Sequence, residues 1–366
     1  MEIALTGLES LEKYFREVYG SEAKIFKVLE LTSGREKKRE ELKGFGYGIP
    51  YLIEVSAKNE TRRVVLETIR PGGFGHEHFS DRAQILLWQH SAFNKLPKHV
   101  RSIDVGAFTS SGSLKSLGDC REFFILTEFV EGEPYYLDLE AIKSRRRASD
   151  LDIKRCLALS DYLVRIHSIK GENLEQLYIR RVRDLIGHGE CIMGLIDSYP
   201  SGLNYANEKT LMNIEKKCVE WRWKLKKKTY RCSCVHGDFH PWNILFHEGL
   251  DFTVLDRSRG EWGEPADDLA AMTINYLFYS LQTYGELKDP FKMLFEMFWE
   301  NYLNKTGDEE ILSVIQPFYA WRGLVIASPI WYPNLPTETR KKIFNFIKNV
   351  LKIETFDVKH VSFYML

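Results

Sequence analysis

Two short apolar runs enclose a loop rich in polar side chains, and this pattern constrains the fold more than any other stretch. Residues 234–246 read Cys-Val-His-Gly-Asp-Phe-His-Pro-Trp-Asn-Ile-Leu-Phe, with one carboxylate, two imidazoles and one carboxamide. A second apolar run, residues 252–255, follows a turn-like segment and ends at Asp256. Two short strands joined in this way form a hairpin. Because a hairpin returns its far end to its near end, we expect Asp256 to lie close to Asn243 and Asp238.

The side chains at this edge of the hairpin suit a hard cation. Magnesium and calcium prefer oxygen ligands, which the carboxylate of Asp256 and the amide of Asn243 provide. The remaining carboxylate, that of Asp238, is then free to accept a proton. The pattern therefore combines a metal site with a proton acceptor.

The length and composition are those of a globular protein with two lobes. A chain of 366 residues is long for one hydrophobic core. The hydrophobic share of 44% and the charged share of 28% are ordinary for globular proteins. The net charge of zero gives no basic excess that favours nucleic acid or an anionic membrane. Since there is no apolar run of about 18 residues, no membrane span is expected.

Cysteine usage and the first residues bear on the cellular compartment. Six cysteines are scattered along the chain, which is typical of a reducing cytosol rather than of a disulfide framework. Residues 1–7 lack the charged start and apolar stretch of a signal peptide. We therefore expect a cytoplasmic protein, and the sequence leaves its oligomeric state open between monomer and homodimer.

Hydrophobic periodicity predicts a small N-terminal lobe built on an antiparallel sheet. Helical spacing covers residues 8–19, and a second helix is expected over residues 80–94 with Trp88 on its inner side. Residues 109–119, rich in Gly and Ser, are expected to form a loop. Strands are expected over residues 25–31, 51–55, 61–69 and 123–130. A Glu-Gly-Glu-Pro segment follows the last strand, so the lobes are placed at residues 1–130 and 131–366.

The C-terminal lobe is expected to be mainly helical. Helices are also expected to begin near residues 267 and 290. Arg180, Arg181 and Arg183 are interpreted as solvated. The other predicted helices cover residues 136–147, 153–167, 174–186, 207–228, 309–327 and 338–352.

The first lobe also carries a glycine-rich turn, with Gly44, Gly46 and Gly48 at alternate positions. Glycines let backbone amides approach a phosphate group closely. The same pattern also fits an ordinary hairpin turn. The turn alone does not separate these two interpretations.

Three motifs, taken in order, resemble the aminoglycoside phosphotransferase/choline kinase family. They are His236-Gly237-Asp238 with Asn243 after it, Leu255-Asp256, and Gly263-Glu264-Pro265 followed by Asp268-Leu269-Ala270. Each motif is moderately specific, and their order with a hairpin-sized gap makes a strong match. The resemblance implies an α+β, protein-kinase-like two-lobe fold. It also implies an enzyme that moves the γ-phosphoryl group of Mg-ATP, or of GTP, to a hydroxyl group of an aminoglycoside-, choline- or sugar-like acceptor.

The resemblance implies a role for each matching residue. Asp238 would be the catalytic base or orient the acceptor hydroxyl, and Asn243 and Asp256 would hold Mg2+. His236 and Asp268 would support the loop. The implied nucleotide-binding residues are Gly44, Gly46, Gly48, Arg70, Arg82, Glu128 and Val130. The three possible substrate residues are His240, Arg257 and Glu261. Arg257 and Arg259 could stabilise the transferring phosphate or bind an anionic substrate, and both are equally well interpreted as solvated loop residues. The candidates that line the acceptor pocket are Glu261, Trp262, His188, Glu190, Tyr319, Arg322, Trp331 and Tyr332.

The third strand departs from the family pattern. The family places a cation there, paired with a Glu on the next helix, whereas this chain has Glu67. One hypothesis is a charge-reversed pair of Glu67 with Arg82, in which Arg82 or Arg70 reaches the phosphates. A second is a shifted register in which Arg70 supplies the cation. A third is a catalytically silent nucleotide-binding or scaffold protein. A protein kinase is disfavoured, because only six residues separate Asp256 from Gly263 and leave little platform for a peptide.

Overall fold

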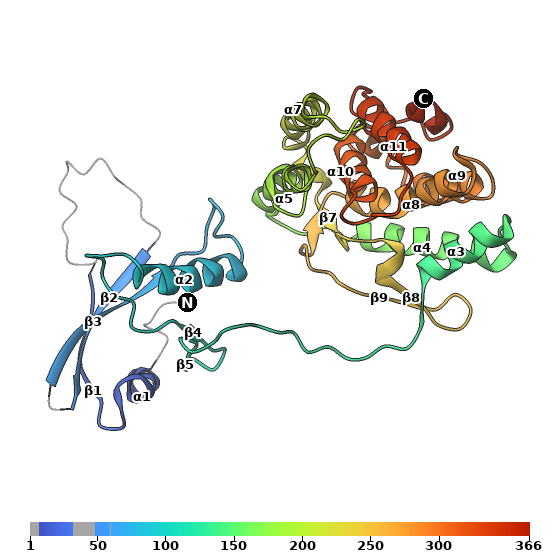
Figure 1. Ribbon diagram of the computed structural model, residues 1–366. Helices are drawn as coiled ribbons and strands as arrows, with labels where there is room; N and C mark the ends of the chain where they lie inside the picture. The colour runs from blue at the N-terminus through green and yellow to red at the C-terminus, as the bar shows by residue number, and fades with distance from the viewer. Residues whose placement is uncertain (1–6, 32–47, 59) are drawn as a thin grey trace. The chain divides into compact units, whose positions relative to one another are not determined.

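The computed structural model describes residues 7–31, 48–58 and 60–366 of the chain (Figure 1). The chain divides into two compact units, Met1–Thr127 and Glu128–Leu366. The first unit is a small sheet with helices, and the second is mainly helical. The predicted α+β class, with a small antiparallel sheet in the first unit and a mainly helical second unit, is confirmed. In the part of the chain that the structure describes, no helix is both long and apolar enough to cross a membrane.

The first unit is built on a three-stranded antiparallel sheet in the order β1-β2-β3. The strands are β1 (Lys24–Glu30), β2 (Gly48–Ala57) and β3 (Glu60–Ile69). Helix α1 (Leu8–Tyr19) places Leu11 and Phe15 in a core with Ile53 and Val55 of β2. Alternate residues of β2 are buried because successive side chains of a strand point to opposite faces of the sheet.

Two sequence predictions for the first unit are wrong in detail. Helix α2 (Phe79–Phe93) forms, but Trp88, expected on its inner side, is 71% exposed. Residues 109–119 were expected to form only a loop, yet β5 (Leu114–Ser116) lies there and pairs with β4 (Gly106–Phe108). A short hairpin of this kind forms because the Gly-containing turn lets the chain reverse tightly.

The predicted strand over residues 123–130 is not formed. The segment has no regular secondary structure, and Phe124, Ile125, Leu126 and Phe129 are each at least 86% exposed. An apolar, β-prone composition favours a strand only where a neighbouring strand offers a hydrogen-bonding edge. No described strand pairs with this segment, which connects the two units.

The second unit is organised around helix α8 (Ala266–Tyr284), whose residues 266–281 are all buried. Asp267 and Asp268 lie in its first turn, where the helix dipole favours negative charge, and Gly285 ends it in a left-handed conformation. The other α-helices of this unit are α3 (Tyr135–Arg145), α4 (Asp150–His167), α5 (Glu175–Gly187), α6 (Ile192–Asp197), α7 (Glu208–Leu225), α9 (Phe291–Thr306), α10 (Gln316–Ala327) and α11 (Thr337–Val350).

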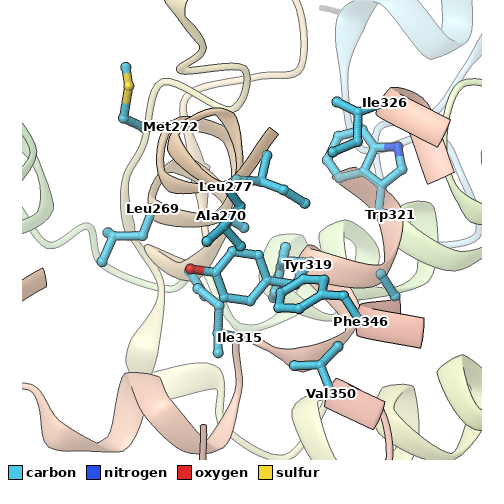
Figure 2. Packing of buried hydrophobic residues seen from close by; sticks show 14 of the residues in the cluster. Leu269, Ala270, Met272, Leu277, Ile315, Tyr319, Trp321, Ile326, Phe346 and Val350 are labelled. Atoms are coloured by element: carbon cyan, nitrogen blue, oxygen red, sulfur yellow. The ribbon is translucent and has the colours of Figure 1, made fainter. Parts of the chain in front are cut away.

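Helices α8, α10 and α11 share a continuous apolar core. Figure 2 shows Leu269 and Ala270 of α8 near Tyr319 of α10 and Phe346 of α11. The rings of Tyr319 and Phe346 meet edge to face, with 5.3 Å between their centres. Each buried large apolar side chain stabilises the fold by about 1.5–3 kcal/mol. The first turn of α8 is therefore held in place by this core, and it can fix the position of the loop at residues 235–243 that contacts it.

The predicted helix over residues 309–327 is broken into two pieces. A 3-10 segment, Glu309–Ser313, comes first, and α10 starts at Gln316 with Pro317 in its first turn. Proline has no N–H to donate, so it is suited to the beginning of a helix and not to its interior. The break allows α10 to start afresh beside α8.

Small strands frame the central loop. The predicted hairpin is confirmed, with β8 (Ile244–Phe246) paired to β9 (Phe252–Val254) and, on its other edge, to β6 (Glu133–Pro134). On the other side of the loop, β7 (Ser233–Cys234) pairs with β10 (Trp262–Gly263). The loop between β7 and β8 is thus anchored at both ends.

Candidate active site

A glycine and a short helical turn shape the loop between β7 and β8. Gly237 has a φ of +85°, in the left-handed region that glycine adopts without strain. A Cβ atom at this position would lie 3.3 Å from Cβ of Arg259 and 3.4 Å from Nη2 of Arg181. A 3-10 turn over Pro241–Asn243 then leads into β8. Glycine therefore lets the loop pass close beside two arginines.

Asp268 anchors the loop to the first turn of α8. Its carboxylate accepts hydrogen bonds from the backbone N–H groups of His236 and Gly237, each at 2.7 Å. The imidazole of His167 lies 3.1 Å from the same carboxylate and 2.9 Å from the hydroxyl of Tyr302. Burial raises the pKa of Asp268, but the hydrogen bond and charge of His167 outweigh burial, so this pKa is lowered. Asp268 is therefore a charged acceptor for two loop amides.

Replacing Asp268 by Asn is expected to lower the free energy of unfolding by about 2–3 kcal/mol. A neutral amide offers one acceptor oxygen where the carboxylate makes charge-assisted bonds with two amides. Urea denaturation measures the change. Asp161→Asn is the matched control, because Asp161 is 48% exposed and pairs with Lys305 at the surface, and we expect it to cost less than about 1 kcal/mol. Equal losses in both variants would contradict a supporting role for Asp268.

Asp238 is held by a buried arginine from α10. Nη1 of Arg322 donates to Oδ1 of Asp238 at 2.5 Å, and its Nη2 donates to Oδ1 of Asp267 at 2.8 Å. The same Nη2 donates to the carbonyl oxygen of Gly237 at 3.2 Å. The Arg322 side chain is 8% exposed, and its guanidinium carbon lies 3.8 Å from the ring centre of Trp321. One guanidinium group thus joins α10, the loop and α8.

These charges shift the pKa values of the two carboxyl groups in opposite directions. Burial raises the pKa of Asp238, but the positive charge of Arg322 outweighs burial and leaves that pKa well below its ordinary value. Burial dominates at Asp267, whose pKa is raised although Arg322 and Arg181 oppose the shift. Asp238 is therefore an ionised hydrogen-bond acceptor and a weak base at neutral pH.

The hairpin brings Asn243 and Asp256 near Asp238. The N–H of Leu255 donates to the carbonyl oxygen of Asn243 at 2.8 Å. The side-chain amide of Asn243 donates to the carbonyl oxygen of Asp238 at 3.1 Å, which leaves its side-chain oxygen for another partner. Asp256 is exposed, with a left-handed φ of 56° that Asp tolerates better than most residues.

This donor set fits a magnesium ion that also binds a nucleotide. Magnesium takes few protein ligands and keeps water and phosphate oxygens, so one amide oxygen and one carboxylate suffice. Among residues 7–31, 48–58 and 60–366, no group of three or more His, Cys, Asp or Glu side chains suits a metal ion. The remaining ligands would therefore come from phosphate and water.

Two of the three possible substrate residues have defined contacts in the loop. Arg257 donates to the carbonyl oxygen of Val235 at 2.8 Å and to that of Glu261 at 3.1 Å. Nε2 of His240 lies 3.6 Å from Oδ2 of Asp238, and its Nδ1 accepts a backbone hydrogen bond at 3.2 Å. Arg257 thus connects two backbone segments, whereas His240 lies beside the carboxylate of Asp238. The third residue, Glu261, is exposed.

The residues expected to bind the nucleotide belong to other parts of the chain. Gly44 and Gly46 lie outside the described residues. Gly48 begins β2, where a Cβ atom would lie 1.9 Å from Oε1 of Glu67. Arg70 is exposed after β3. Glu128 and Val130 lie in the irregular segment that connects the two units.

The expected ion pair between Glu67 and Arg82 is not formed between these two described residues. Nη1 of Arg82 instead donates to three backbone carbonyl oxygens at the start of α2. Five donors in a planar fork suit a guanidinium group to such a cluster of carbonyls. Arg70 as the missing cation stays a prediction.

Sequence reasoning misjudged Arg181 and did not assign Asp267 or His167 to the site. Arg181, interpreted as solvated, is only 19% exposed and lies 3.5 Å from Asp267. Asp267 was not assigned to the site, although two adjacent acidic residues at the start of an apolar helix are a signal that cations lie nearby. His167 gave no signal, since a single His at the end of an amphipathic helix is common.

Two aromatic candidates for the acceptor pocket lie elsewhere. Tyr319 is buried in the core (Figure 2). Its hydroxyl lies 2.7 Å from that of Thr273 and accepts a hydrogen bond from Nε1 of Trp299 at 3.1 Å. Trp331 follows α10 and is 64% exposed. Glu190, by contrast, accepts a hydrogen bond from Arg259 at 3.0 Å.

A two-unit α+β fold in which Asp238 and Asn243 share the loop between β7 and β8, and Asp256 follows the paired strand β9, points to the phosphotransferases. The model of the phosphotransferase enzyme family, APH, matches residues 60–289, which is more than half of the chain. The chain belongs to this family. No curated protein matches the chain.

Several solved structures are similar to the chain at low identity. An amicoumacin kinase is 15% identical, and the match covers 84% of this chain and 88% of the chain of that kinase, with a TM-score of 0.41. A Plasmodium vivax ethanolamine kinase is 16% identical, and the match covers 87% of this chain and 78% of the ethanolamine kinase chain, with a TM-score of 0.34. A choline kinase from Cryptosporidium parvum is 13% identical, and the match covers 98% of this chain and 92% of the choline kinase chain, with a TM-score of 0.32.

Proposed function

We propose that this protein transfers the γ-phosphoryl group of Mg-ATP, or of Mg-GTP, to a hydroxyl group of a small molecule. The observation that supports this most is the pair of hydrogen bonds at Asn243, one to Asp238 at 3.1 Å and one from Leu255 at 2.8 Å. They connect Asn243 to the backbone of Asp238 and to the residue before Asp256, which supports a site that uses these three side chains. Phosphoryl transfer needs this kind of positioning and charge neutralisation more than covalent chemistry.

In this proposal Asp238 orients the acceptor. Its carboxylate accepts a hydrogen bond from the acceptor hydroxyl, whose oxygen forms a bond to the γ-phosphorus as the bond to the nucleoside diphosphate breaks. The hydroxyl proton passes to Asp238 and then to solvent. Because the transition state is loose, little base strength is needed until late. Arg322 keeps Asp238 ionised, and the low pKa suits an orienting group better than a strong base.

The metal would be held by Asn243 and Asp256. When bound, magnesium supplies charge neutralisation at the nucleotide phosphates. The side chain of Asn243 is oriented by its hydrogen bond to the carbonyl oxygen of Asp238. The position of Asp256 follows from the pairing of β8 with β9 just before it.

Asp256→Asn is expected to weaken the binding of magnesium-bound ATP by at least about tenfold. Losing a charged ligand should matter at least as much as losing an outer-shell partner, which typically costs about 10–100-fold in metal affinity. Titration calorimetry measures the Kd with and without Mg2+. If the variant bound magnesium-bound ATP as tightly as the parent protein, Asp256 would not be a metal ligand.

A catalytically silent nucleotide-binding protein is the second candidate, and Glu67 favours it. This acidic residue stands on β3 where the family has a cation, and Arg82 donates to backbone carbonyl groups. An assay of ADP release with amino alcohols, sugars and aminoglycosides, run beside calorimetry with magnesium-bound ATP, separates the two. Binding with no turnover on any acceptor would favour the silent protein.

We further propose that residues 1–130 bind the nucleotide and that residues 131–366 carry the catalytic loop and the acceptor pocket. The compartment proposed is the cytoplasm. All six cysteines are free thiols and four of them are buried, which suits a reducing environment.

A further inference from the structure

Three guanidinium groups gather around the catalytic loop within the second unit. Arg322 pairs with the carboxylates of Asp238 and Asp267, and Arg181 lies 3.5 Å from Asp267. Nη2 of Arg259 lies 3.9 Å from Oδ2 of Asp238. A Cβ atom added to Gly237 would lie within 3.4 Å of both Arg181 and Arg259, so glycine leaves room for both side chains beside the loop. The acceptor hydroxyl would therefore enter a site in which three arginines are each paired with a carboxylate.

The three arginines differ in the partners that neutralise them. Arg181 and Arg322 face carboxylates that are buried in the protein. Arg259 donates to Glu190 at 3.0 Å, and the Glu190 side chain is 67% exposed while that of Arg259 is 18% exposed. Exposed ion pairs contribute little to stability because water competes for both charges. Glu190 is thus a partner that a bound anion can displace at little cost.

The guanidinium of Arg259 is held in a fixed orientation. Its Cζ lies 4.9 Å from the ring centre of Trp321, and Nε1 of Trp321 donates to the backbone carbonyl of Glu190 at 3.1 Å. Arginine stacked on an aromatic ring keeps its planar fork available for two parallel hydrogen bonds. The ring therefore orders both members of the ion pair.

Unpaired donors remain in this cluster. The Nε atoms of Arg181, Arg259 and Arg322 are buried and have no acceptor among the described residues. Buried donors without partners are rare and cost about 1–3 kcal/mol each. The arrangement has more donors than the acceptors around it satisfy, as expected of a site for an oxyanion.

We propose that the acceptor carries an anionic group, a carboxylate or a phosphate, which Arg259 binds in place of Glu190. This inference rests on the proposed function, because it names the class of hydroxyl compound that the same site accepts. Arginine binds both oxyanions through two parallel hydrogen bonds. A cationic group could not take the place of Glu190, because it would repel the guanidinium of Arg259. The acceptor is therefore a hydroxy acid or a phosphorylated alcohol.

Binding without nucleotide gives the first test. Calorimetry with D-glycerate, glycerol 3-phosphate and glycerol should show binding of one or both anions and none of glycerol, and the stronger anion identifies the group. Arg259→Met should weaken anion binding by about 10-fold or more, and Arg259→Lys by less, because one charge-assisted pair is lost. Glu190→Gln should strengthen it, since the competing carboxylate is gone. Misfolding of the Glu190→Gln variant cannot explain stronger anion binding.

The control is Arg183→Met, on the same helix as Arg181. Arg183 is 45% exposed and lies 3.6 Å from Asp184, so its loss removes one positive charge outside the cluster. Anion binding should be unchanged in this variant. If Arg183→Met and Arg259→Met weakened anion binding equally, the loss of affinity would come from the net charge of the protein and not from Arg259. That result would overturn the proposal.

Turnover gives the second test, with choline added to the panel. Arg259→Met should raise KM for the anionic acceptor and leave kcat less affected. A fall in kcat on every acceptor alike would assign Arg259 to the transferring phosphoryl group and overturn the inference. Faster turnover of choline or glycerol than of either anion would overturn it while the proposed function stands. If none of the acceptors gave ADP release, the result would count against the proposed function. Calorimetry with the anions would then decide the anion site by itself.

Discussion

Asp238→Asn is expected to lower kcat for phosphoryl transfer by about 10²- to 10⁴-fold while nucleotide affinity stays nearly unchanged. An amide cannot take up the hydroxyl proton, and positioned acid–base groups contribute about this much to a rate. Coupled ADP release gives kcat, and calorimetry gives the Kd of magnesium-bound ATP. The variant separates Asp238 from Asp256, whose replacement is expected to act on nucleotide binding itself.

The matched control for this variant is Asp251→Asn on the same hairpin. Asp251 is exposed in the turn between β8 and β9, so the same chemical change there should leave kcat unaltered. A fully active Asp238→Asn enzyme would show that the carboxylate neither orients the hydroxyl nor accepts its proton. The assignment of this loop as the catalytic centre would then be wrong.

Arg322→Met is expected to destabilise the fold by about 3–5 kcal/mol. The change leaves the carboxylates of Asp238 and Asp267 buried without their shared cation, and breaking a buried ion pair from one side costs about this much. Urea denaturation at pH 7 measures the free energy of unfolding. Lys217→Met is the control, because Lys217 is 47% exposed, pairs with Glu220 at the surface and should cost less than about 1 kcal/mol.

The pH dependence gives a signature that a simple packing defect lacks. In the parent protein the folded pKa of Asp238 is depressed, so its contribution to stability is present above the unfolded pKa of about 4 and is lost as pH falls through the folded pKa. Without Arg322, burial raises the folded pKa of Asp238 above its unfolded pKa. Ionisation of Asp238 then destabilises the folded protein as pH rises through that range. The destabilisation by Arg322→Met should therefore be larger at pH 8 than at pH 5.

A double variant tests the same charge balance. Asp238→Asn combined with Arg322→Met removes one of the two stranded carboxylates, so it should be more stable than Arg322→Met alone. If the double variant lost the sum of both single effects, the two side chains would not interact through the 2.5 Å hydrogen bond.

Local patterns in the sequence predict the parts of the site that local structure makes. Asn243 and Asp256 are brought together by a hairpin whose two strands and turn are contiguous, so alternation and turn residues suffice. The spacing from Gly263 to Asp268 likewise places a carboxylate at the start of a helix. These are short-range features, and they are where sequence reasoning is most reliable.

Contacts between distant segments escape the same reasoning. Arg322 and Asp238 are 84 positions apart, and no periodicity connects them. Arg322 was one of several candidates for the pocket, but its pairing with the carboxylate of Asp238 depends on how α10 packs against α8. The strand expected at residues 123–130 failed for a related reason, since a strand needs a partner edge as well as a suitable composition.

The contrast between Asp268 and Glu190 has a consequence for how such an enzyme can diversify. Asp268 is fully buried in the helix that carries the core, so changing it should alter fold and catalysis together. Glu190 lies at the surface, and its side chain pairs with Arg259 while its backbone carbonyl accepts a hydrogen bond from Trp321. Substitutions at Glu190 and in the neighbouring loop are thus open to selection at little structural cost. A new acceptor preference can arise there while the phosphoryl-transfer machinery is inherited unchanged.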